Sequence, residues 1–272
     1  MQSFKLDRGD RLFTGSTVSA DLPEVYGDGS ISLLNKVSDK DDITKCLEIA
    51  AGQEGLTYTN YERSGLGFIN FNTERAPMND PAVRQAIAYL TDRDGIVQET
   101  LGGYGMRAQG YFGLGQWMYL VLNGSVGYPG TQTEDGEEAD EELTKQWEAL
   151  SLSEITSYDP SLNFTETEDG HHVWKTSALE DDELWEHAVS MRQTEPADVL
   201  GYCAKWLEFQ KRFMETLPAL PIYSNVYFDF YPQVLHDYMI RDAVSCPQAI
   251  LGAYLAEYIP AEEEPAGNQP AE

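Results

Sequence analysis

Hydrophobic residues recur every three or four positions in five segments of the chain. Side chains at this spacing lie on one face of an α-helix, so the pattern predicts amphipathic helices that bury this face. The longest stripe runs from Val199 to Leu217, and Pro218 ends it because proline cannot continue a helix. The predicted helices cover residues 39–51, two short pieces that begin at Pro81 and after Asp92, residues 181–193 and residues 195–217.

The two short helices carry start and stop signals. Asp80 can cap free backbone N–H groups, and Pro81 is tolerated at the first helical position. Asp92 predicts a second cap, and the glycines at 102–103 predict the end of the second piece. The apolar stripe of the first helix consists of Val83, Ile87 and Leu90.

Alternating apolar and polar residues predict strands between the helices. Residues 58–73 have the pattern of a strand, a turn at Ser64-Gly65 and a second strand, and the aromatic residues 220–231 predict a late strand. Residues 1–40 predict loops with short strands, and the Gly- and aromatic-rich residues 103–129 predict irregular structure. Strands interspersed with helices in this order predict an α/β fold.

The charge of the chain narrows the classes of partner. The formal net charge is −28, from 46 acidic and 18 basic residues. A field of this sign repels phosphate backbones and anionic lipid headgroups, so we expect neither nucleic-acid nor membrane-surface binding. The same charge keeps a protein soluble, and it identifies no partner. The sequence contains no apolar run long enough for a membrane span.

Three further segments bear on secretion and on which parts of the chain are exposed or disordered. Residues 1–7 lack the regions of a secretory signal, which leaves a cytoplasmic protein or a mature or partial chain as alternatives. Residues 131–142 are the most acidic stretch and predict an exposed loop, but their spacing departs from a calcium-binding loop. Residues 260–272 are acidic and rich in Pro and Ala, which predicts a disordered tail.

The sequence offers little catalytic chemistry. It contains no G-x-S-x-G nucleophile elbow, no phosphate-binding loop and no H-E-x-x-H zinc helix. Cys46, Cys203 and Cys246 are odd in number and widely spaced, which argues against a disulfide framework and a cysteine zinc site and leaves one bridge open. His171 and His172 are adjacent, and adjacent strand residues point to opposite faces, so they predict a surface pair rather than a metal site. We therefore expect no enzyme, no cofactor and no metal.

Two segments nevertheless resemble a known family. From Phe68 to Tyr111 the chain has a strand ending in Phe-Asn, then a proline, then a D-x-x-V-R-Q-A-I helix and a D-R pair. This order resembles the extracytoplasmic solute-binding proteins of family 5, the peptide- and nickel-binding group of ABC importers. A weaker resemblance covers residues 183–238, where Trp206, Phe209 and Gln210 precede the stretch LPALPIYSN.

The resemblance implies a fold and a function. It implies a class II periplasmic-binding-protein-like lobe, with a mixed sheet flanked by helices, over residues 1–259. It also implies an extracytoplasmic lipoprotein that binds oligopeptides or other small solutes and delivers them to an ABC permease. Members of the family are usually much longer, so the chain looks like an internally shortened second lobe. The alternative is a non-transport protein-interaction module built on the same lobe.

The resemblance also suggests roles for single residues. Asp80, Arg84, Asp92 and Arg93 match the family motif, and we expect them to cap helices and brace the backbone rather than touch a ligand. The candidate ligand-binding residues are the aromatic Trp117, Tyr119 and Tyr223 with the amide of Asn225, which would line a cleft for an extended peptide. For each of them, packing in the core is the alternative.

Overall fold

The structure is a computed structural model of the chain, and it describes residues 2–6, 13–16, 22–29, 31–126, 158–195, 198–238 and 246–255. The chain divides into two compact units. Unit 1 comprises residues 1–60 and 228–272, and unit 2 comprises residues 61–227. The expected acidic loop and the expected tail lie outside the described residues. The single lobe expected over residues 1–259 stays a prediction, and the two units are described separately.

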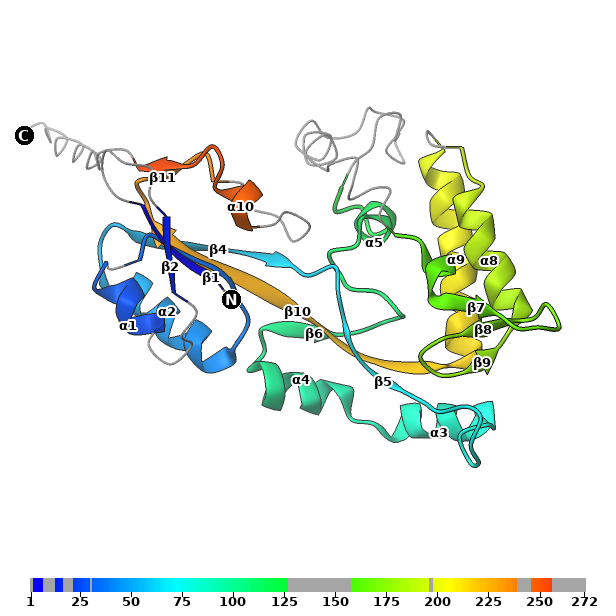
Figure 1. Ribbon diagram of the computed structural model, residues 1–272. Coiled ribbons are helices and arrows are strands. Elements are labelled where there is room, and N and C mark those ends of the chain that lie inside the picture. Colours follow the sequence, from blue (N-terminus) through cyan, green and yellow to red (C-terminus); the bar gives the residue numbers. More distant parts are fainter. Residues whose placement is uncertain are drawn as a thin grey trace, which may run out of the picture. The chain divides into compact units, whose positions relative to one another are not determined.

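Unit 1 is built on antiparallel strands with helices beside them (Figure 1). Strand β1 pairs with β2 and with β3, and β3 pairs with the late strand β10. The strands are β1 (Gln2–Leu6), β2 (Phe13–Ser16), β3 (Leu33–Val37), β11 (Leu235–His236), β12 (Tyr254–Leu255) and parts of β4 (Leu56–Glu62) and β10 (Ala219–Pro232). The helices are α1 (Leu22–Gly27), α2 (Lys40–Gly52) and α10 (Cys246–Ala249).

The helix predicted over residues 39–51 is confirmed as α2. The Asp39 carboxylate accepts hydrogen bonds from the N–H groups of Asp41 and Asp42, at 2.9 and 3.2 Å, so it caps the helix. The expectation of only loops and short strands before residue 40 is wrong at α1. This helix has six residues, which is too short to show a repeat.

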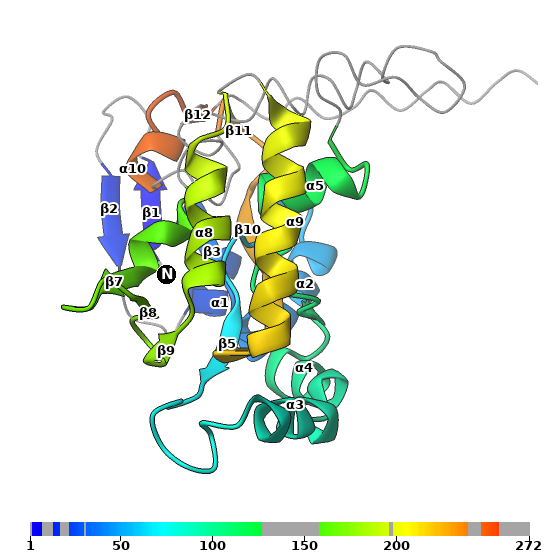
Figure 2. The ribbon, with the colours of Figure 1, turned by 90° about the vertical axis from the view of Figure 1, so that its right-hand side faces the viewer.

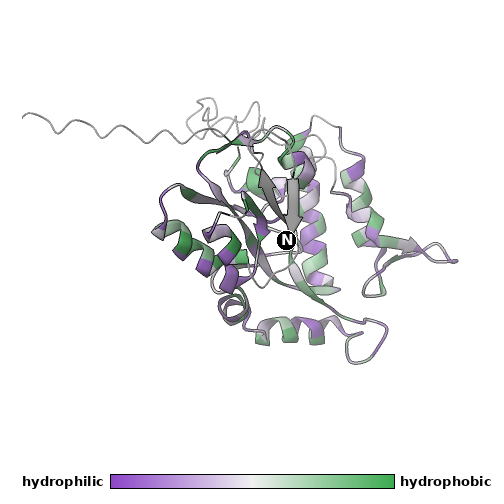
Figure 3. Ribbon diagram, turned by 60° about the vertical axis from the view of Figure 1, so that its left-hand side comes forward, coloured by the Kyte–Doolittle hydropathy of each residue, from purple (hydrophilic) through white to green (hydrophobic). Residues whose placement is uncertain are grey.

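Unit 2 contains the long helices and several short strands. Figure 2 shows α8 and α9 side by side, and Figure 3 shows hydrophobic and hydrophilic residues in alternating bands along the helices. The strands are β5 (Gly67–Asn70), β6 (Gly105–Arg107), β7 (Phe164–Glu166), β8 (His172–Trp174) and β9 (Leu179–Glu180). The helices are α3 (Pro81–Leu90), α4 (Arg93–Leu101), α5 (Trp117–Leu122), the 3-10 turn Pro160–Asn163, α8 (Asp182–Arg192) and α9 (Val199–Thr216).

The apolar stripes of α8 and α9 form the core of unit 2. Leu184, Ala188 and Met191 are buried, as the repeat in residues 181–193 predicts. They belong to one cluster with aromatic residues from α9 and from β8. The largest fully buried side chains of this cluster are Trp174, Trp206, Phe209 and Phe213.

Two details of the predicted helices are wrong. Helix α9 begins at Val199 with Asp198 as its cap, whereas the sequence suggested a start at residue 195. Leu90 does not belong to a buried stripe, because 86% of its surface is exposed. The buried residue of α3 is Arg84. The α/β class and the strand predicted over residues 220–231 are confirmed, the latter as β10.

Candidate functional site

A pocket of about 420 Å³ lies beside α9 in unit 2. Its apolar wall comes from α5, α9 and the loop between β6 and α5, and the polar residues Gln109, Asn123, Gln210 and Lys211 complete the lining. A mostly apolar pocket with a few fixed polar groups is the usual form of a small-ligand site. The apolar wall consists of Phe112, Tyr119, Leu122, Trp206, Leu207 and Met214.

The Gln210 amide fixes one side of this pocket. Its Oε1 accepts a hydrogen bond from the backbone N–H of Tyr111 at 2.9 Å, and its Nε2 donates to the Tyr111 carbonyl at 3.3 Å. The same Nε2 donates to the Tyr158 hydroxyl at 3.4 Å. Burial raises the pKa of Tyr111 and of Tyr158, so both hydroxyls stay neutral at physiological pH. Gln210 therefore holds the loop that contains Tyr111 against α9.

Of the two residues on α5 that are predicted to bind ligand, one lines the pocket and the other does not. Tyr119 lies in the wall, and its ring centroid is 5.2 Å from that of Phe112. Trp117, two positions earlier on α5, is buried in the core, with its ring 5.2 Å from Tyr202. Successive helical residues are about 100° apart, so these two side chains point in nearly opposite directions.

The other two predicted ligand residues lie on β10, outside this pocket. The Tyr223 ring covers Gly67, where an added Cβ would lie 2.6 Å from the ring. Asn225 is buried, and its Oδ1 accepts from Arg63 Nη1 at 3.3 Å. The Arg63 guanidinium also lies 5.4 Å from the centre of the Tyr227 ring. A ligand role for Trp117, Tyr223 and Asn225 stays a prediction, and the described contacts are those of packing and strand pairing.

The first two motif residues hold α3. Asp80 caps the helix, because its carboxylate accepts from the N–H of Ala82 at 2.8 Å. Arg84 donates from Nε to the Leu217 carbonyl at 3.0 Å, from Nη1 to Met78 at 2.5 Å and from Nη2 to Thr216. Arg84 thereby ties α3 to the last carbonyls of α9, and it is not among the residues that line the pocket beside α9.

The second pair of motif residues acts in the same way on α4. Asp92 accepts from the N–H of Gly95 at 2.9 Å and caps the helix. Arg93 donates from Nη1 to the carbonyls of Ala108 and Pro221, at 3.2 and 3.4 Å. Burial lowers the pKa of Arg93, which nevertheless stays charged. Both arginines donate to backbone carbonyls, and the expectation that they do not touch a ligand stays a prediction.

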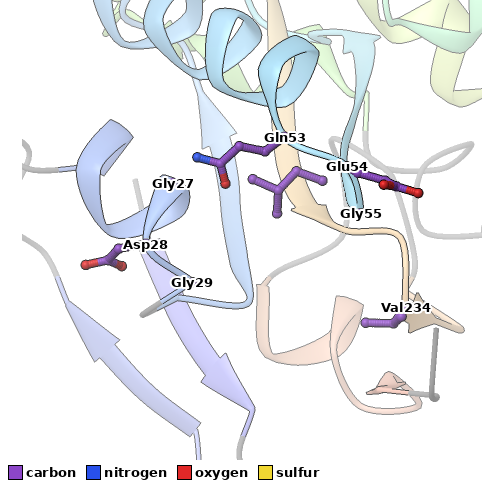
Figure 4. Close-up of a pocket in the computed structure, with 8 residues that line it drawn as sticks. Gly27, Asp28, Gly29, Gln53, Glu54, Gly55 and Val234 are labelled. Atoms are coloured by element: carbon purple, nitrogen blue, oxygen red, sulfur yellow. The ribbon is translucent and has the colours of Figure 1, made fainter.

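Unit 1 has a pocket of its own, of about 640 Å³ (Figure 4). It is lined by the turn after α1, with Asp28, and by the turn after α2, with Glu54. Figure 4 shows these two acidic side chains well apart on different turns. Sequence reasoning missed this pocket, whose local signal is the glycines beside Asp28 and Glu54. Two carboxylates that lie apart do not form an acid–base pair, so the residues that line this pocket do not indicate a particular reaction.

The adjacent histidines converge, contrary to the opposite faces expected of them. His171 Nδ1 lies 2.7 Å from Asp182 Oδ2, and His172 Nδ1 lies 3.1 Å from Asp182 Oδ1. The backbone N–H of His172 also donates to Asp182 Oδ1 at 2.8 Å. Because His171 precedes β8, it escapes the strand alternation that the prediction assumed. Both histidines therefore share the first carboxylate of α8.

This cluster predicts a pH dependence. The hydrogen bond to Asp182 raises the pKa of His171, and the bond from His171 is the first cause that lowers the pKa of Asp182 to about 2. The raised pKa stabilises the fold below about pH 6.5, and this contribution is lost as the pH rises through the folded value of His171. The lowered pKa stabilises above about pH 4, and this contribution is lost as the pH falls through about 2. The cluster thus contributes most between about pH 4 and 6.5.

A proton NMR titration measures this effect directly. We expect the pKa of His171 to lie above about 6.5 in the unchanged protein and to fall in Asp182→Asn. Asp169→Asn, which removes an exposed carboxylate from the turn before His171, should leave the titration midpoint in place. Equal midpoints in the unchanged protein and in Asp182→Asn would contradict the interaction.

The part of the chain that the structure describes contains neither a cluster of metal-ligating side chains nor a helix that could span a membrane. No group of three or more His, Cys, Asp or Glu side chains there could hold a metal ion. Among the same residues, no helix has the length and apolar character needed to cross a membrane. Cys46, Cys203 and Cys246 are buried and free, and burial raises the pKa of the Cys246 thiol to about 11.

Comparison with solved structures identifies the fold. The oligopeptide-binding protein AppA from Bacillus subtilis, in complex with a nonapeptide, matches with a TM-score of 0.52 and 14% identity, over 86% of this chain and 58% of that one. A dipeptide-binding protein from a Pseudoalteromonas species, in complex with Met-Leu, gives 0.56 and 14%, over 89% and 57%. NikZ from Campylobacter jejuni, in complex with Ni(L-His), gives 0.56 and 15%, over 91% and 63%. The chain thus spans 57% to 63% of the length of these three proteins.

These matches define the molecule as a protein with the class II periplasmic-binding-protein fold, as the sequence predicts. A family model described as bacterial extracellular solute-binding proteins, family 5 Middle, matches residues 30–178, which is more than half of the chain. The chain belongs to this family of solute-binding proteins. A search of curated proteins gave no match.

Proposed function

We propose that the chain is the ligand-binding part of an ABC-importer solute-binding protein and that its ligands are oligopeptides. Family membership supports the binding of a solute without catalysis. Two of the similar structures hold peptides, a nonapeptide and Met-Leu, whereas NikZ holds a nickel complex. In this proposal the protein works outside the cytoplasm and passes its ligand to a membrane permease.

The observation that carries the peptide proposal is the largely apolar pocket beside α9, whose lining contains one basic residue, Lys211. Its aromatic and aliphatic wall suits a peptide side chain, and burying such a side chain contributes about 1.5–3 kcal/mol. A bare nickel ion would need carboxylate, imidazole or thiolate ligands from the protein. The pocket residues include no His, Cys, Asp or Glu, so the wall offers no ligand to a bare metal ion and suits an apolar peptide side chain.

A titration with tri- and tetrapeptides containing Leu or Phe tests this function. We expect weak, saturable binding, because a chain of this length supplies only part of the surface that its structural neighbours contain. The five tryptophans give separate indole N–H signals in NMR, and Trp206 in the pocket wall should shift on binding. Thermal stabilisation that follows the occupied fraction is an independent measure.

Two leucines on α9 provide a matched pair of variants. Leu207 lines the pocket and is 47% exposed, whereas Leu200 lies outside it and is 54% exposed. We expect Leu207→Asp to weaken peptide binding about tenfold, since it replaces apolar wall with charge, and Leu200→Asp to leave it unchanged. Equal binding by both variants, or no binding by the unchanged protein, would contradict the proposal.

A further inference from the structure

Strand β5 has one paired edge and one open edge. Its pairing with β10 places Ile69 opposite Leu220 and Phe68 opposite Pro221, and within the described ranges no second strand pairs with it. Just beyond β5, the N–H of Phe71 donates to the Pro218 carbonyl at 3.0 Å. Backbone groups of successive strand residues point to alternate edges, so Ile69 faces β10. The N–H and C=O groups of Phe68 and Asn70 therefore face the open edge.

The side chains beside this edge are apolar and half-exposed. Phe68 is 40% exposed and Ile69 48% exposed, and as neighbours in a strand they lie on opposite faces of the sheet. The Phe68 ring is 5.4 Å from that of Tyr111, whose backbone Gln210 holds at the pocket. Ile69 lies opposite Leu220, which belongs to a buried apolar cluster. The open edge thus has apolar surface on both of its faces.

Soluble proteins usually protect an edge strand with charge, with proline or with a covering element. Strand β6, on the other side of β10, follows this rule, because Arg107 pairs with Asp94 at 3.2 Å and α4 packs against the strand. Strand β5, with the sequence Gly-Phe-Ile-Asn, has neither a charge nor a proline. Its edge therefore has the properties of an acceptor for another strand.

We propose that the open edge of β5 binds the main chain of an extended peptide as an added strand. This inference rests on the proposed function, and it names where the peptide backbone binds. Only an extended backbone presents donors and acceptors at the spacing of Phe68 and Asn70. The peptide residues that lie beside Ile69 and Phe68 would be apolar or β-branched. The net charge of −28 favours a cationic peptide over an anionic one.

The heptapeptide Lys-Val-Thr-Val-Thr-Val-Lys is a suitable probe, because it favours extended structure and carries positive charge. Asn70→Pro removes the N–H that faces the open edge and leaves the ladder bonds of Ile69 and Phe71 to β10 in place. We expect this variant to bind the probe about 3- to 10-fold more weakly, as for the loss of one backbone hydrogen bond. Replacing both lysines of the probe by glutamate should also weaken binding.

The matched control lies on β6, at the edge that faces away from β10. The N–H of Ala108 donates to the Ile222 carbonyl at 3.1 Å, so the preceding residue, Arg107, faces away from β10. Arg107→Pro therefore removes an outward N–H from β6, and we expect unchanged binding of the probe. If Asn70→Pro fails to fold, the probe with every amide N-methylated replaces it, and its binding to the unchanged protein should be lost.

The outcomes separate this inference from the proposed function. Suppose that the unchanged protein binds the probe and that neither Asn70→Pro nor N-methylation of the probe weakens this binding. The edge is then not the site, and the proposed function stands. If the unchanged protein binds no peptide at all, the proposed function fails together with the edge. Self-association that Asn70→Pro abolishes, without peptide binding, would assign the edge to a second copy of the chain and overturn the peptide proposal.

Discussion

Replacing Arg84 with alanine should lower the free energy of unfolding by about 3–5 kcal/mol. Only 2% of the Arg84 surface is exposed, and its guanidinium donates to the carbonyls of Met78, Thr216 and Leu217. Two of these carbonyls belong to the C-terminal end of α9, where a positive charge is favourable. Alanine would leave the carbonyls without these donors and open a cavity between α3 and the end of α9.

The backbone at the end of α9 increases this dependence. Leu217 has a φ of 46°, in the left-handed region that a leucine adopts only at a cost of order 1 kcal/mol. The hydrogen bond from Arg84 Nε to its carbonyl helps to hold this conformation. Loss of the arginine should therefore loosen both the helix end and the start of β10.

Two variants show whether geometry or charge is responsible. Arg84→Lys keeps the charge but cannot reach three carbonyls with one planar group, so we expect it to recover less than half of the loss. Arg75→Ala, at an exposed arginine in the loop before α3, should change stability by less than about 0.5 kcal/mol. Urea unfolding followed by circular dichroism measures all three. A loss below about 1 kcal/mol for Arg84→Ala would contradict the buried network.

The sequence predicts those parts of the fold whose signal is local. Helices α2, α3, α4 and α8 each begin after an aspartate that caps them, and α4 also ends at a glycine with a φ of 60°. Their stripes and caps lie within a few residues, so a single segment contains the whole signal. Helix α1 lacks this length, and Leu90, the last residue of α3, is exposed among the described residues.

The site depends on contacts that no local pattern encodes. The pocket beside α9 joins residues 109–123 to residues 206–214, and a satisfied glutamine holds them together. Helical geometry alone could have separated Trp117 from Tyr119, since residues two apart on a helix cannot share a face. Helix capping by Asp80 needs only neighbouring residues, whereas the bonds from Arg84 to the carbonyls of Thr216 and Leu217 join distant parts of the chain. The open edge of β5 depends on strand pairing, which sequence alone does not give.

Replacing Asp229 with alanine is expected to destabilise unit 1 by about 3–4 kcal/mol. Asp229 is fully buried on β10, and its Oδ1 accepts from the backbone N–H of Lys36 at 2.6 Å and from Asn35 Nδ2 at 3.3 Å. Its Oδ2 accepts from the Tyr238 hydroxyl at 2.6 Å. The carboxylate thus joins β3, β10 and Tyr238, which lies two residues after β11, and alanine would remove the acceptor shared by three donors.

A double-mutant cycle with Tyr238→Phe resolves this network. The single change to phenylalanine removes one donor to Asp229 and one acceptor for Asn35, whose Nδ2 lies 2.7 Å from the hydroxyl, so we expect a loss of about 1–2 kcal/mol. Once alanine replaces Asp229, the same change should cost at least about 1 kcal/mol less, because its main partner is already gone. Additive losses in urea unfolding would mean that Tyr238 and the carboxylate act independently. Amide hydrogen exchange tests the position of Lys36, whose φ of 59° is held by the bond from its N–H to Asp229. The alanine variant at Asp229 should lose exchange protection at this residue.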